Sequence, residues 1–373
     1  MTWSAWAAGE RRRILDAGQW REIRGFDAVG PRGTVGGREV VAFASNDYLG
    51  LTTHPAAIAA AHAALDRWGV GSGSARLIVG ARPVHSELEH ELAAWKHTSA
   101  ALLFPTGYAA NLGVLTTFGG PDTLICSDER NHASIVDGTR LAHAEVGIYR
   151  HADVDHLAAL LDTAGHRRSI VVTDSVFSMD GDVAPLDELV DLCRARGAML
   201  VLDEAHAILG PEPDLDGVDV LRVGTLSKTL GTLGGFVAAD RAFVELLVNR
   251  ARPFIFTTAP TPADIAAARA SLAVLRSAEG VALCTRLRAH VERIAPGHPS
   301  PIIPVVLGDE QRALDASAAL LDRGLLVPAI RPPTVAPGTS RLRISLSAAH
   351  TTDEVERLAV ALAELSTPAT VGS

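Results

Sequence analysis

Short apolar runs alternate with amphipathic stretches through the middle of this sequence, and the alternation limits the fold more than any other feature. The runs predict strands at residues 100–104, 123–126, 145–149, 169–173, 198–202, 219–223 and 234–239. Helical patterns lie between them at residues 107–115, 132–141, 154–162 and 185–196. Because the strand runs are continuously apolar, they indicate an α/β fold with a mainly parallel central sheet covered by helices on both faces. Such sheets bind ligands beyond the carboxyl ends of their strands.

The sequence on either side of this central part has a different pattern. A strand at residues 38–43 and helices at residues 55–68 and 83–95 come before it. After Arg252 the pattern predicts helices at 262–277 and 281–294, strands at 301–307, 325–329 and 340–346, and a last helix at 352–365. This mixture is typical of a smaller α+β domain. We therefore expect an N-terminal segment (1–45), a large domain (46–258) and a small C-terminal domain (259–373).

Composition limits the kind of protein further. The 373 residues are 47% hydrophobic and 21% charged, as in proteins that form a core. A formal net charge of −9 argues against nucleic acid as a partner. Cys126, Cys193 and Cys284 are scattered, which indicates a reducing compartment and no paired-cysteine metal site. Residues 1–17 are interrupted by the charged run Glu10–Arg13, so we expect an amphipathic helix, no membrane span and a soluble cytoplasmic protein.

One lysine lies where a solvated side chain would be badly placed. Lys228 belongs to the stretch Gly224–Gly231, which is rich in hydroxyls and glycines and connects two of the apolar runs. Lysine is almost never buried without a partner. One interpretation is a lysine that condenses with a carbonyl cofactor. The other is an ordinary lysine in a surface loop, and this stretch alone does not separate the two.

Two acids and a histidine follow the run at residues 198–202. The sequence Asp203-Glu204-Ala205-His206 also occurs in helicases, but the phosphate loop that a nucleoside triphosphatase needs is absent from the sequence. A carboxylate at Asp203 could instead keep a pyridinium nitrogen protonated, with His206 near the ring hydroxyl. Asp203 could equally cap the following turn.

The turn after the strand at residues 100–104 is suited to an anion. Gly107 would expose the first backbone N–H groups of the next helix, where the helix dipole adds to their effect. Gly107, Asp203 and Lys228 each lie at the carboxyl end of a predicted strand. Together they describe a site for pyridoxal phosphate.

These residues carry a resemblance that extends over nearly the whole chain. The sequence resembles the α-oxoamine synthase family of fold-type I pyridoxal-phosphate enzymes. The matching segments are Ser45–Leu51, Asp174–Asp182, Asp203–His206 and Thr225–Lys228. The resemblance implies pyridoxal 5'-phosphate as cofactor and a homodimer with active sites at its interface. It also implies the condensation of an amino acid with an acyl thioester.

The resemblance gives each matching residue a role. Lys228 would hold the cofactor and later move the substrate α-proton, and Asp203 would pair with the ring nitrogen. The ring itself would be contacted by His132, stacked on its face, and by His206 and Ser178 at its oxygen. The backbone of Gly107 and Tyr108 and the hydroxyl of Thr225 would bind the phosphate. Thr257 or Thr258 would reach the partner subunit's phosphate. Asn46 and Arg343 would bind the amino-acid carboxylate. Without the resemblance, His132 fits a helix cap and Arg343 an exposed strand arginine.

Two further segments favour a member that uses L-alanine and a pimeloyl thioester. They are Ile330–Val335 and Gly338–Arg343. Arg331 stands in a position where other members usually have tyrosine, and with Arg21 it is a candidate to bind the far carboxylate of the acyl group. Arg331 could instead be a structural residue paired with an acid. The sequence leaves open whether the thiol is coenzyme A or an acyl carrier protein.

Two alternatives stay open within the resemblance. A sister enzyme would use glycine with an acetyl or succinyl thioester, and a catalytically silent member would serve as a partner protein. The chain departs from the family after His206, where Ala207 replaces a glycine and the glycine-rich segment is shortened. The wall near the substrate entrance is therefore not carried over from the family.

Overall fold

A computed structural model of the chain describes residues 1–165 and 167–366. Contacts within the chain group it into two units. The first unit contains Met1–Ala44, Pro304–Ile344 and the described residues from Val360 onward, and the second contains Ser45–Ile303 and Ser345–Ala359. The three-part division that the sequence suggests stays a prediction.

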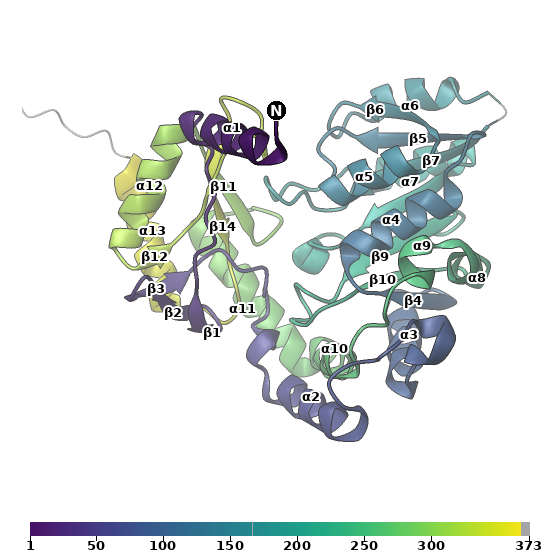
Figure 1. Cartoon of the computed structure of the whole chain (residues 1–373), viewed down its shortest axis with the longest axis horizontal. Coiled ribbons are helices and arrows are strands. Elements are labelled where there is room, and N and C mark those ends of the chain that lie inside the picture. The colour runs from purple at the N-terminus through teal and green to yellow at the C-terminus, as the bar shows by residue number, and fades with distance from the viewer. Residues whose placement is uncertain (166, 367–373) are drawn as a thin grey trace, which may run out of the picture. The chain divides into compact units, whose positions relative to one another are not determined.

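Within the described residues, a seven-stranded sheet forms the centre of the second unit (Figure 1). In spatial order its strands are β4 (Ala100–Phe104), β10 (Gly235–Ala239), β9 (Val220–Thr225), β8 (Met199–Asp203), β7 (Arg168–Asp174), β5 (Thr123–Asp128) and β6 (Glu145–Tyr149). The neighbouring pairs from β9 to β6 are parallel, whereas β10 is antiparallel to both β9 and β4. The mainly parallel sheet predicted from the sequence is confirmed.

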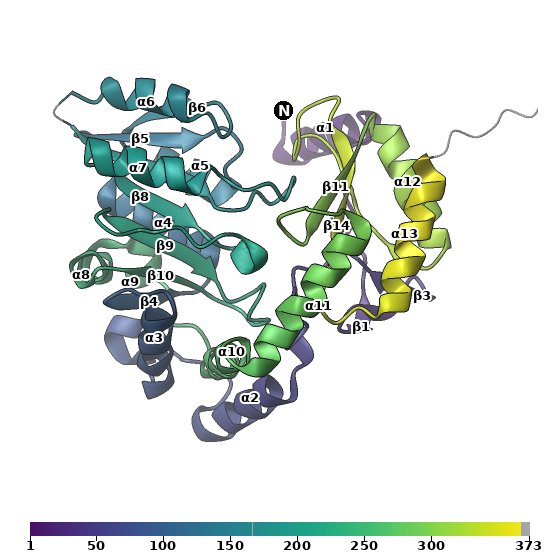
Figure 2. The same cartoon turned by 180° about the vertical axis from the view of Figure 1, so that it is seen from behind.

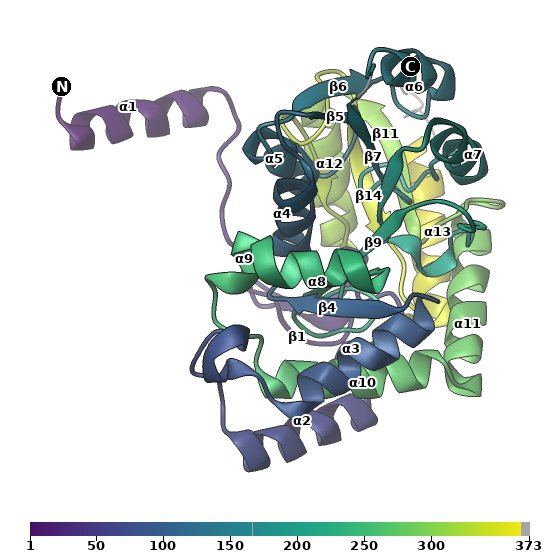
Figure 3. The same ribbon diagram turned by 90° about the vertical axis from the view of Figure 1, so that its right-hand side faces the viewer.

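Helices cover both faces of this sheet. The helices of the second unit are α2 (Pro55–Trp68), α3 (Pro83–Trp95), α4 (Gly107–Phe118), α5 (Ala133–Leu141), α6 (Val154–Asp162), α7 (Leu186–Arg196), α8 (Arg241–Arg250), α9 (Arg252–Ile255), α10 (Pro262–Leu275) and α11 (Ala278–Ile294), with short helices η1 (Leu51–Thr53), η2 (Arg76–Gly80) and η3 (Ala207–Leu209); of these, α2 packs on α10. Successive strand residues face opposite ways, so Val201 packs with α4 and α5, whereas Leu200 and Leu202 pack with α6 and α7. Figure 1 shows α4 and α5 over one face, and Figure 2 shows α7 over the other. Figure 3 shows α8 and α9 beside β4.

The first unit contains two smaller sheets. One has the order β1 (Asp27–Val29), β2 (Arg32–Val35), β3 (Arg38–Ala42) and β12 (Leu325–Leu326), and the other has the order β11 (Ile302–Gly308), β14 (Ser340–Ser345) and β13 (Ala329–Ile330). The helices are α1 (Trp3–Asp16), α12 (Glu310–Asp322) and α13 (Thr352–Ser366), of which α13 includes residues of both units, as do β11 and β14. None of the helices in the described residues has the length and apolarity needed to cross a bilayer.

The single strand predicted at residues 325–329 is wrong. The structure has two short strands instead, because β12 pairs with β3 and β13 pairs with β14. Pro328 lies between them, and a proline cannot donate a hydrogen bond to a neighbouring strand. Its carbonyl accepts a hydrogen bond from the backbone N–H of Arg343 at 3.1 Å. The sequence analysis also missed β1, β2, α8 and α12.

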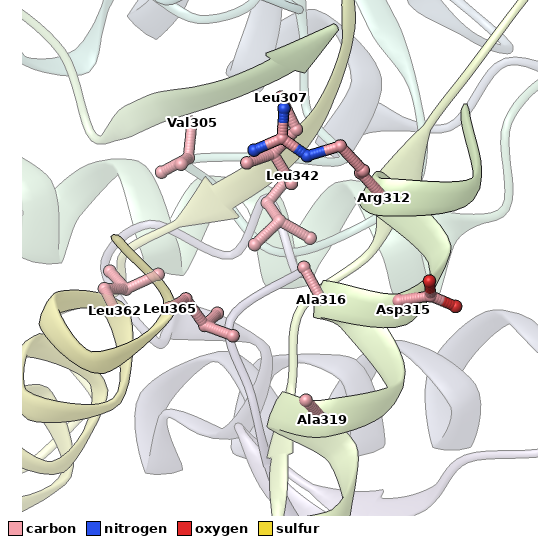
Figure 4. Close-up of a pocket in the computed structure, with 9 residues that line it drawn as sticks. All are labelled: Val305, Leu307, Arg312, Asp315, Ala316, Ala319, Leu342, Leu362 and Leu365. Atoms are coloured by element: carbon pink, nitrogen blue, oxygen red, sulfur yellow. The ribbon is translucent and has the colours of Figure 1, made fainter. Parts of the chain in front are cut away.

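A pocket of about 410 Å³ lies in the first unit between β11, β14, α12 and α13 (Figure 4). Its walls come mainly from aliphatic side chains, and Arg312 and Asp315 of α12 stand at one side. None of the residues that the sequence nominates for cofactor or substrate binding lines this pocket. It is therefore not assigned to the candidate site.

Candidate active site

Polar residues end three neighbouring strands of the large sheet. Asp174 ends β7 and Asp203 ends β8, and the two residues are paired in the parallel register. Lys228 comes shortly after Thr225, where β9 ends. Because parallel strands bring their carboxyl ends to one edge, these side chains gather there.

The side chain of Lys228 contacts His206. Its amine Nζ lies 2.9 Å from Nε2 of the imidazole. Nδ1 of the same ring lies 2.6 Å from the hydroxyl of Tyr48, and this hydroxyl donates to Oδ1 of Asn46 at 3.2 Å. Tyr48 is 0% exposed and His206 is 4% exposed, while Lys228 is half-buried. The structure therefore brings Lys228, His206 and Asn46 together.

Asp47 fixes the turn that presents Asn46 and Tyr48. Its Oδ1 accepts a hydrogen bond from the backbone N–H of Leu51 at 2.8 Å, and its Oδ2 accepts one from the hydroxyl of Thr52 at 2.5 Å. Burial raises the pKa of Asp47, and the hydrogen bonds from Thr52 oppose this effect. The side chain thus ties the segment after β3 to the start of η1.

Asp203 is buried and oriented by donors on two sides. Its Oδ2 accepts a hydrogen bond from Nδ2 of Asn111 at 2.6 Å, and its Oδ1 accepts one from the backbone N–H of Ala205 at 2.9 Å. Nδ2 of Asn111 also donates to the hydroxyl of Ser134 at 2.9 Å. Asn111 belongs to α4, so this helix holds the carboxylate that ends β8. A fixed carboxylate in a buried site is suited to bind a cationic or N–H group.

His132 begins α5 and lies in the same charged surroundings. Its ring is partly exposed, and its Nδ1 lies 2.8 Å from the hydroxyl of Ser134. Its backbone N–H donates to Oδ2 of Asp174 at 2.8 Å, which holds the start of the helix against β7. The surrounding protein lowers the pKa of His132, an effect that Asp203 opposes and Lys228 increases. Burial and the nearby Asp203 raise the pKa of Asp174 well above its usual range.

The start of α4 lies against the end of β9. A Cβ atom at Gly107 would come within 3.2 Å of Cβ of Thr225, and one at Gly235 would come within 2.5 Å of the backbone nitrogen of Gly107. Glycine is therefore needed for this close approach. The first N–H groups of a helix have no acceptor within the helix, and those of α4 begin here, near Thr225. The arrangement is suited to a phosphate group.

The comparisons with known proteins agree with this geometry. The model of the family "Aminotransferase class I and II" matches residues 38–362. The chain belongs to the class I and II aminotransferase family. The resemblance found in the sequence is confirmed.

Relatives within this family share the length of the chain. An 8-amino-7-oxononanoate synthase of Anaeromyxobacter dehalogenans is 52% identical over 96% of this chain and 94% of its own. One of Methylobacterium nodulans is 46% identical over 96% of this chain and 93% of its own.

Solved structures in the family have the same fold. The serine palmitoyltransferase of Sphingomonas wittichii has a TM-score of 0.89 at 32% identity, with 96% of both chains covered. The 8-amino-7-oxononanoate synthase of Francisella tularensis has a TM-score of 0.72 at 26% identity, with 87% of this chain and 96% of its own covered.

The residues at the sheet edge fit the cofactor of this family. Lys228 offers an amine for a carbonyl group, and Asp203 offers a buried carboxylate for a ring nitrogen. The start of α4 with Thr225 offers donors for a phosphate. Tyr108 is exposed, and its hydroxyl donates to Asp137. The predicted role of this residue at the phosphate concerns its backbone N–H and does not involve this side-chain contact.

The other lysine of the chain has a different environment. Lys96 is 7% exposed, and its Nζ lies 2.8 Å from Oε2 of Glu204 and 4.1 Å from the ring centre of Trp95. Glu204 also accepts a hydrogen bond from Nε of Arg222 at 2.8 Å. Since Glu204 directly follows Asp203, one end of β8 supplies both an acid for the candidate site and an acid that neutralises Lys96.

The remaining predicted residues lie on other segments of the chain. Ser178 is half-buried in the loop after β7, Thr257 is half-buried and Thr258 is exposed after α9. Arg343, Arg331 and Arg21 belong to the first unit. Their roles stay predictions.

The structure gives details of these three arginines. Arg343 is 6% exposed on β14, unlike the exposed strand arginine of the alternative interpretation. Nη1 of Arg331 donates to the carbonyl of Gly18 at 2.9 Å and lies 3.8 Å from Glu310, which provides the acid expected of a structural pair. Nη2 of Arg21 donates to the hydroxyl of Thr334 at 3.4 Å.

Sequence reasoning missed four side chains that shape the site: Tyr48, Asn111, Ser134 and Asp174. Two of them carried a usable signal. Asn111 is a polar residue in the otherwise apolar helix α4, and Asp174 is an acid at the end of an apolar strand. Buried polar groups need partners, so each pointed to a second polar group nearby. The identity of that second group depends on the order of the strands in the sheet, which the sequence does not show.

Proposed function

We propose that this chain is an 8-amino-7-oxononanoate synthase. It would join L-alanine to a pimeloyl thioester, release carbon dioxide and the thiol, and form 8-amino-7-oxononanoate for biotin biosynthesis. The observation that carries the proposal is the amine of Lys228 held at 2.9 Å by His206 on the sheet edge that also carries Asp203. Full-length relatives of that name at 46–52% identity support the choice of reaction within the family.

The cofactor would be pyridoxal 5'-phosphate. When bound, it withdraws the electrons that remain on the amino-acid α-carbon after its proton leaves. Lys228 would hold its carbonyl carbon, Asp203 its ring nitrogen, and His206 and Ser178 its ring oxygen. Gly107, Tyr108 and Thr225 would bind its phosphate. The exposed imidazole of His132 would stack on the face of the cofactor ring.

Lys228 would also act on the substrate. Once its amine is released by the incoming amino acid, it can accept the α-proton as a general base. His206 contacts the amine of Lys228, and Asn111 orients the buried carboxylate of Asp203, which would face the ring nitrogen. General base catalysis by a positioned group typically contributes about 10²–10⁴-fold to the rate.

The two carboxylates of the substrates would be bound by separate groups. Asn46 and Arg343 would hold the carboxylate of alanine, where an arginine can form two parallel hydrogen bonds. Arg331 and Arg21 would hold the far carboxylate of the pimeloyl group, since a charged group entering a cleft needs a partner. We further propose a cytoplasmic homodimer in which Thr257 or Thr258 reaches the phosphate of the partner subunit.

A second candidate reaction uses serine and a palmitoyl thioester. The serine palmitoyltransferase structures support it by fold, with a TM-score of 0.89. Their identity of 32% is well below the 52% of the synthase relative, which supports the first candidate. The acyl group separates the two, because a palmitoyl chain has no far carboxylate.

A panel of amino acids and acyl thioesters tests the proposal. The purified protein, loaded with pyridoxal phosphate, is incubated with L-alanine, glycine or L-serine and with pimeloyl, succinyl, acetyl or palmitoyl thioesters, and the product mass is measured. We expect the mass of 8-amino-7-oxononanoate from alanine and pimeloyl thioester. A better product yield from serine and palmitoyl thioester would overturn the assignment. Pimeloyl groups on coenzyme A and on acyl carrier protein are compared in the same assay.

A further inference from the structure

Four side chains of the second unit form a line of hydrogen bonds that ends at Lys228. Asn46, Tyr48, His206 and Lys228 are joined at 3.2, 2.6 and 2.9 Å. The two middle members are the most deeply buried, with Tyr48 at 0% and His206 at 4% exposure. Further contacts hold the backbone around Tyr48, whose carbonyl accepts a hydrogen bond from the N–H of Ala348 at 2.8 Å.

The chemistry of the four groups allows two directions for these bonds. A lysine ammonium has only donors, so it requires Nε2 of His206 as an acceptor. A neutral imidazole then carries its proton on Nδ1 and donates to the oxygen of Tyr48, and the Tyr48 hydroxyl donates to Oδ1 of Asn46. When the amine is neutral, the ring can reverse, with Nε2–H donating to Lys228 and Nδ1 accepting from Tyr48.

We propose that Tyr48 is a positioning residue that sets the tautomer of His206 and thereby the proton on Lys228. The proposal deepens the proposed function and rests on it for its catalytic meaning, because Lys228 must lose a proton to act as nucleophile and base. It also connects Asn46, the predicted partner of the amino-acid carboxylate, to the amine through two side chains. Binding of a carboxylate at Asn46 would then favour one of the two directions.

Other charged groups face Lys228 and act on it independently of Tyr48. The charges of His132 and Asp174 interact with its amine, and Asp203 in turn interacts with both of these residues. A substitution at Tyr48 leaves all three in place. The comparison between wild type and a Tyr48 variant therefore isolates the contribution of the hydrogen-bond line.

The change Tyr48→Phe removes one oxygen and keeps the buried ring. In the ammonium state the Nδ1 proton of His206 then loses its acceptor at 2.6 Å, whereas the neutral state leaves the ring free to adopt either tautomer. The ammonium state is therefore the more destabilised one. Leaving a buried donor without its partner shifts such an equilibrium by about one pKa unit. We expect the titration midpoint of Lys228 to fall by about one pH unit.

The chain is well suited to this measurement because it has two lysines, Lys96 and Lys228. The full-length protein is freed of cofactor with hydroxylamine, treated with a limiting amount of acetic anhydride across a pH series, and the acetylation of each lysine is followed by peptide mass spectrometry. Well below the midpoint, Lys228 should react about 10-fold faster in Tyr48→Phe than in wild type. Lys96, buried against Glu204, should stay nearly unreactive. Its acetylation would reveal an unfolded variant.

A matched control is Tyr149→Phe. Tyr149 is 1% exposed and packs in the cluster with α6 and α7, away from these four residues, so its loss of a hydroxyl should leave the Lys228 midpoint unchanged. An unchanged or raised midpoint in Tyr48→Phe would overturn the proposal. The titration of Lys228 does not depend on the substrates. The product assay can therefore refute the proposed function while the proposal about Tyr48 holds, and the titration can refute the proposal about Tyr48 while the proposed function holds.

A second measurement is made on the wild-type protein and needs no Tyr48 variant. The ¹⁵N chemical shifts of His206, assigned by comparison with His206→Gln, report which ring nitrogen carries the proton. We expect the proton on Nδ1 below the Lys228 midpoint and on Nε2 above it. A single tautomer across the whole titration would contradict the proposal.

Discussion

Nδ2 of Asn111 donates a 2.6 Å hydrogen bond to Oδ2 of Asp203. The two residues are far apart in the sequence and meet because α4 packs on the sheet over β9 and β10, in the same core cluster as Val201 of β8. Both are buried, Asn111 at 1% and Asp203 at 5% exposure. The helix that would present donors to a phosphate therefore also orients the carboxylate that would hold the ring nitrogen.

Removing the charge of Asp203 should abolish most turnover. Asp203→Asn keeps the size of the side chain but cannot keep a ring nitrogen protonated. We expect at least a ~10²-fold loss of kcat, the low end of what loss of a proton-handling group costs. Cofactor should stay bound through Lys228 and the phosphate site, as measured by absorbance after gel filtration. Near-wild-type turnover in this variant would remove Asp203 from the mechanism.

Asn111→Ala should reduce turnover less, by about 10-fold, because the carboxylate keeps its charge and loses one orienting donor. Thr117→Val provides the matched control. Thr117 is a buried polar residue of the same helix whose hydroxyl has no hydrogen-bond partner in residues 1–165 and 167–366. We expect Thr117→Val to keep wild-type turnover. Equal effects of the two substitutions would mean that Asn111 contributes only to folding.

Arg331 should determine the preference for a charged acyl group. Its guanidinium is held by the carbonyl of Gly18 and lies near Glu310, so it is partly oriented before any substrate binds. Loss of a charge-assisted hydrogen bond should raise the KM for pimeloyl thioester about 10-fold in Arg331→Ala, with little effect on the KM for alanine. Arg21→Ala should act in the same direction.

Arg38→Ala serves as the control for these variants. Arg38 is an exposed arginine of the first unit that pairs with Asp322 at 2.7 Å, and its loss should leave both KM values unchanged. Wild-type protein should also prefer pimeloyl over an uncharged acyl thioester of similar length. If the wild type uses both equally, the pimeloyl assignment fails and only the family assignment stands.

Loss of the proton from His151 should make the protein less stable at alkaline pH. Its Nδ1 lies 3.1 Å from Asp128 and its Nε2 lies 2.6 Å from Asp182, which tie the loop carrying Ser178 to the end of β5. Burial alone would lower the pKa of His151, but the hydrogen bonds to these two carboxylates raise it to about 9. Its backbone N–H, moreover, donates to Glu129 at 3.2 Å.

The raised pKa of His151 sets the direction of the pH dependence. Because the folded-state pKa exceeds the unfolded value, the stabilisation is complete below pH ~6.5 and is lost as the pH rises through about 9. The wild-type free energy of unfolding, measured in urea, should fall between pH ~6.5 and ~10 by on the order of 2 kcal/mol more than that of His151→Gln. The exposed His62→Gln variant should behave as wild type. Parallel curves for wild type and His151→Gln would contradict the assignment.

Much of the fold could be predicted because most strands of the large sheet have apolar centres, and β5, β7, β8 and β9 each end in a polar residue. The direction of β10 was not visible in that pattern. Only the short connection from Leu226 to Gly234 indicates it, since a parallel pair needs a crossover of a dozen or more residues. The helix α12 was missed although its buried residues Ala313, Ala316 and Leu320 recur at helical spacing.

Sequence reasoning nominated the ionisable residues Lys228, Asp203 and His206 but missed Asp174 and the neutral side chains that orient them. Lys228, Asp203 and His206 stand in segments with a recognisable spacing. Tyr48 and Asn111 reach them only through the order of strands and helices in space, which one sequence does not specify. A local pattern can show that a buried polar residue such as Asn111 needs a partner, but not which distant residue that partner is.

Reduction with borohydride tests the central claim most directly, because it fixes the cofactor to whichever lysine holds it. The protein is loaded with pyridoxal phosphate, reduced, digested and mapped by mass spectrometry. The claim predicts the pyridoxyl group on Lys228, whose half-buried amine lies beside His206. It predicts none on Lys96, which is 7% exposed and paired with Glu204. A label on Lys96, or no label on either lysine, would contradict the account.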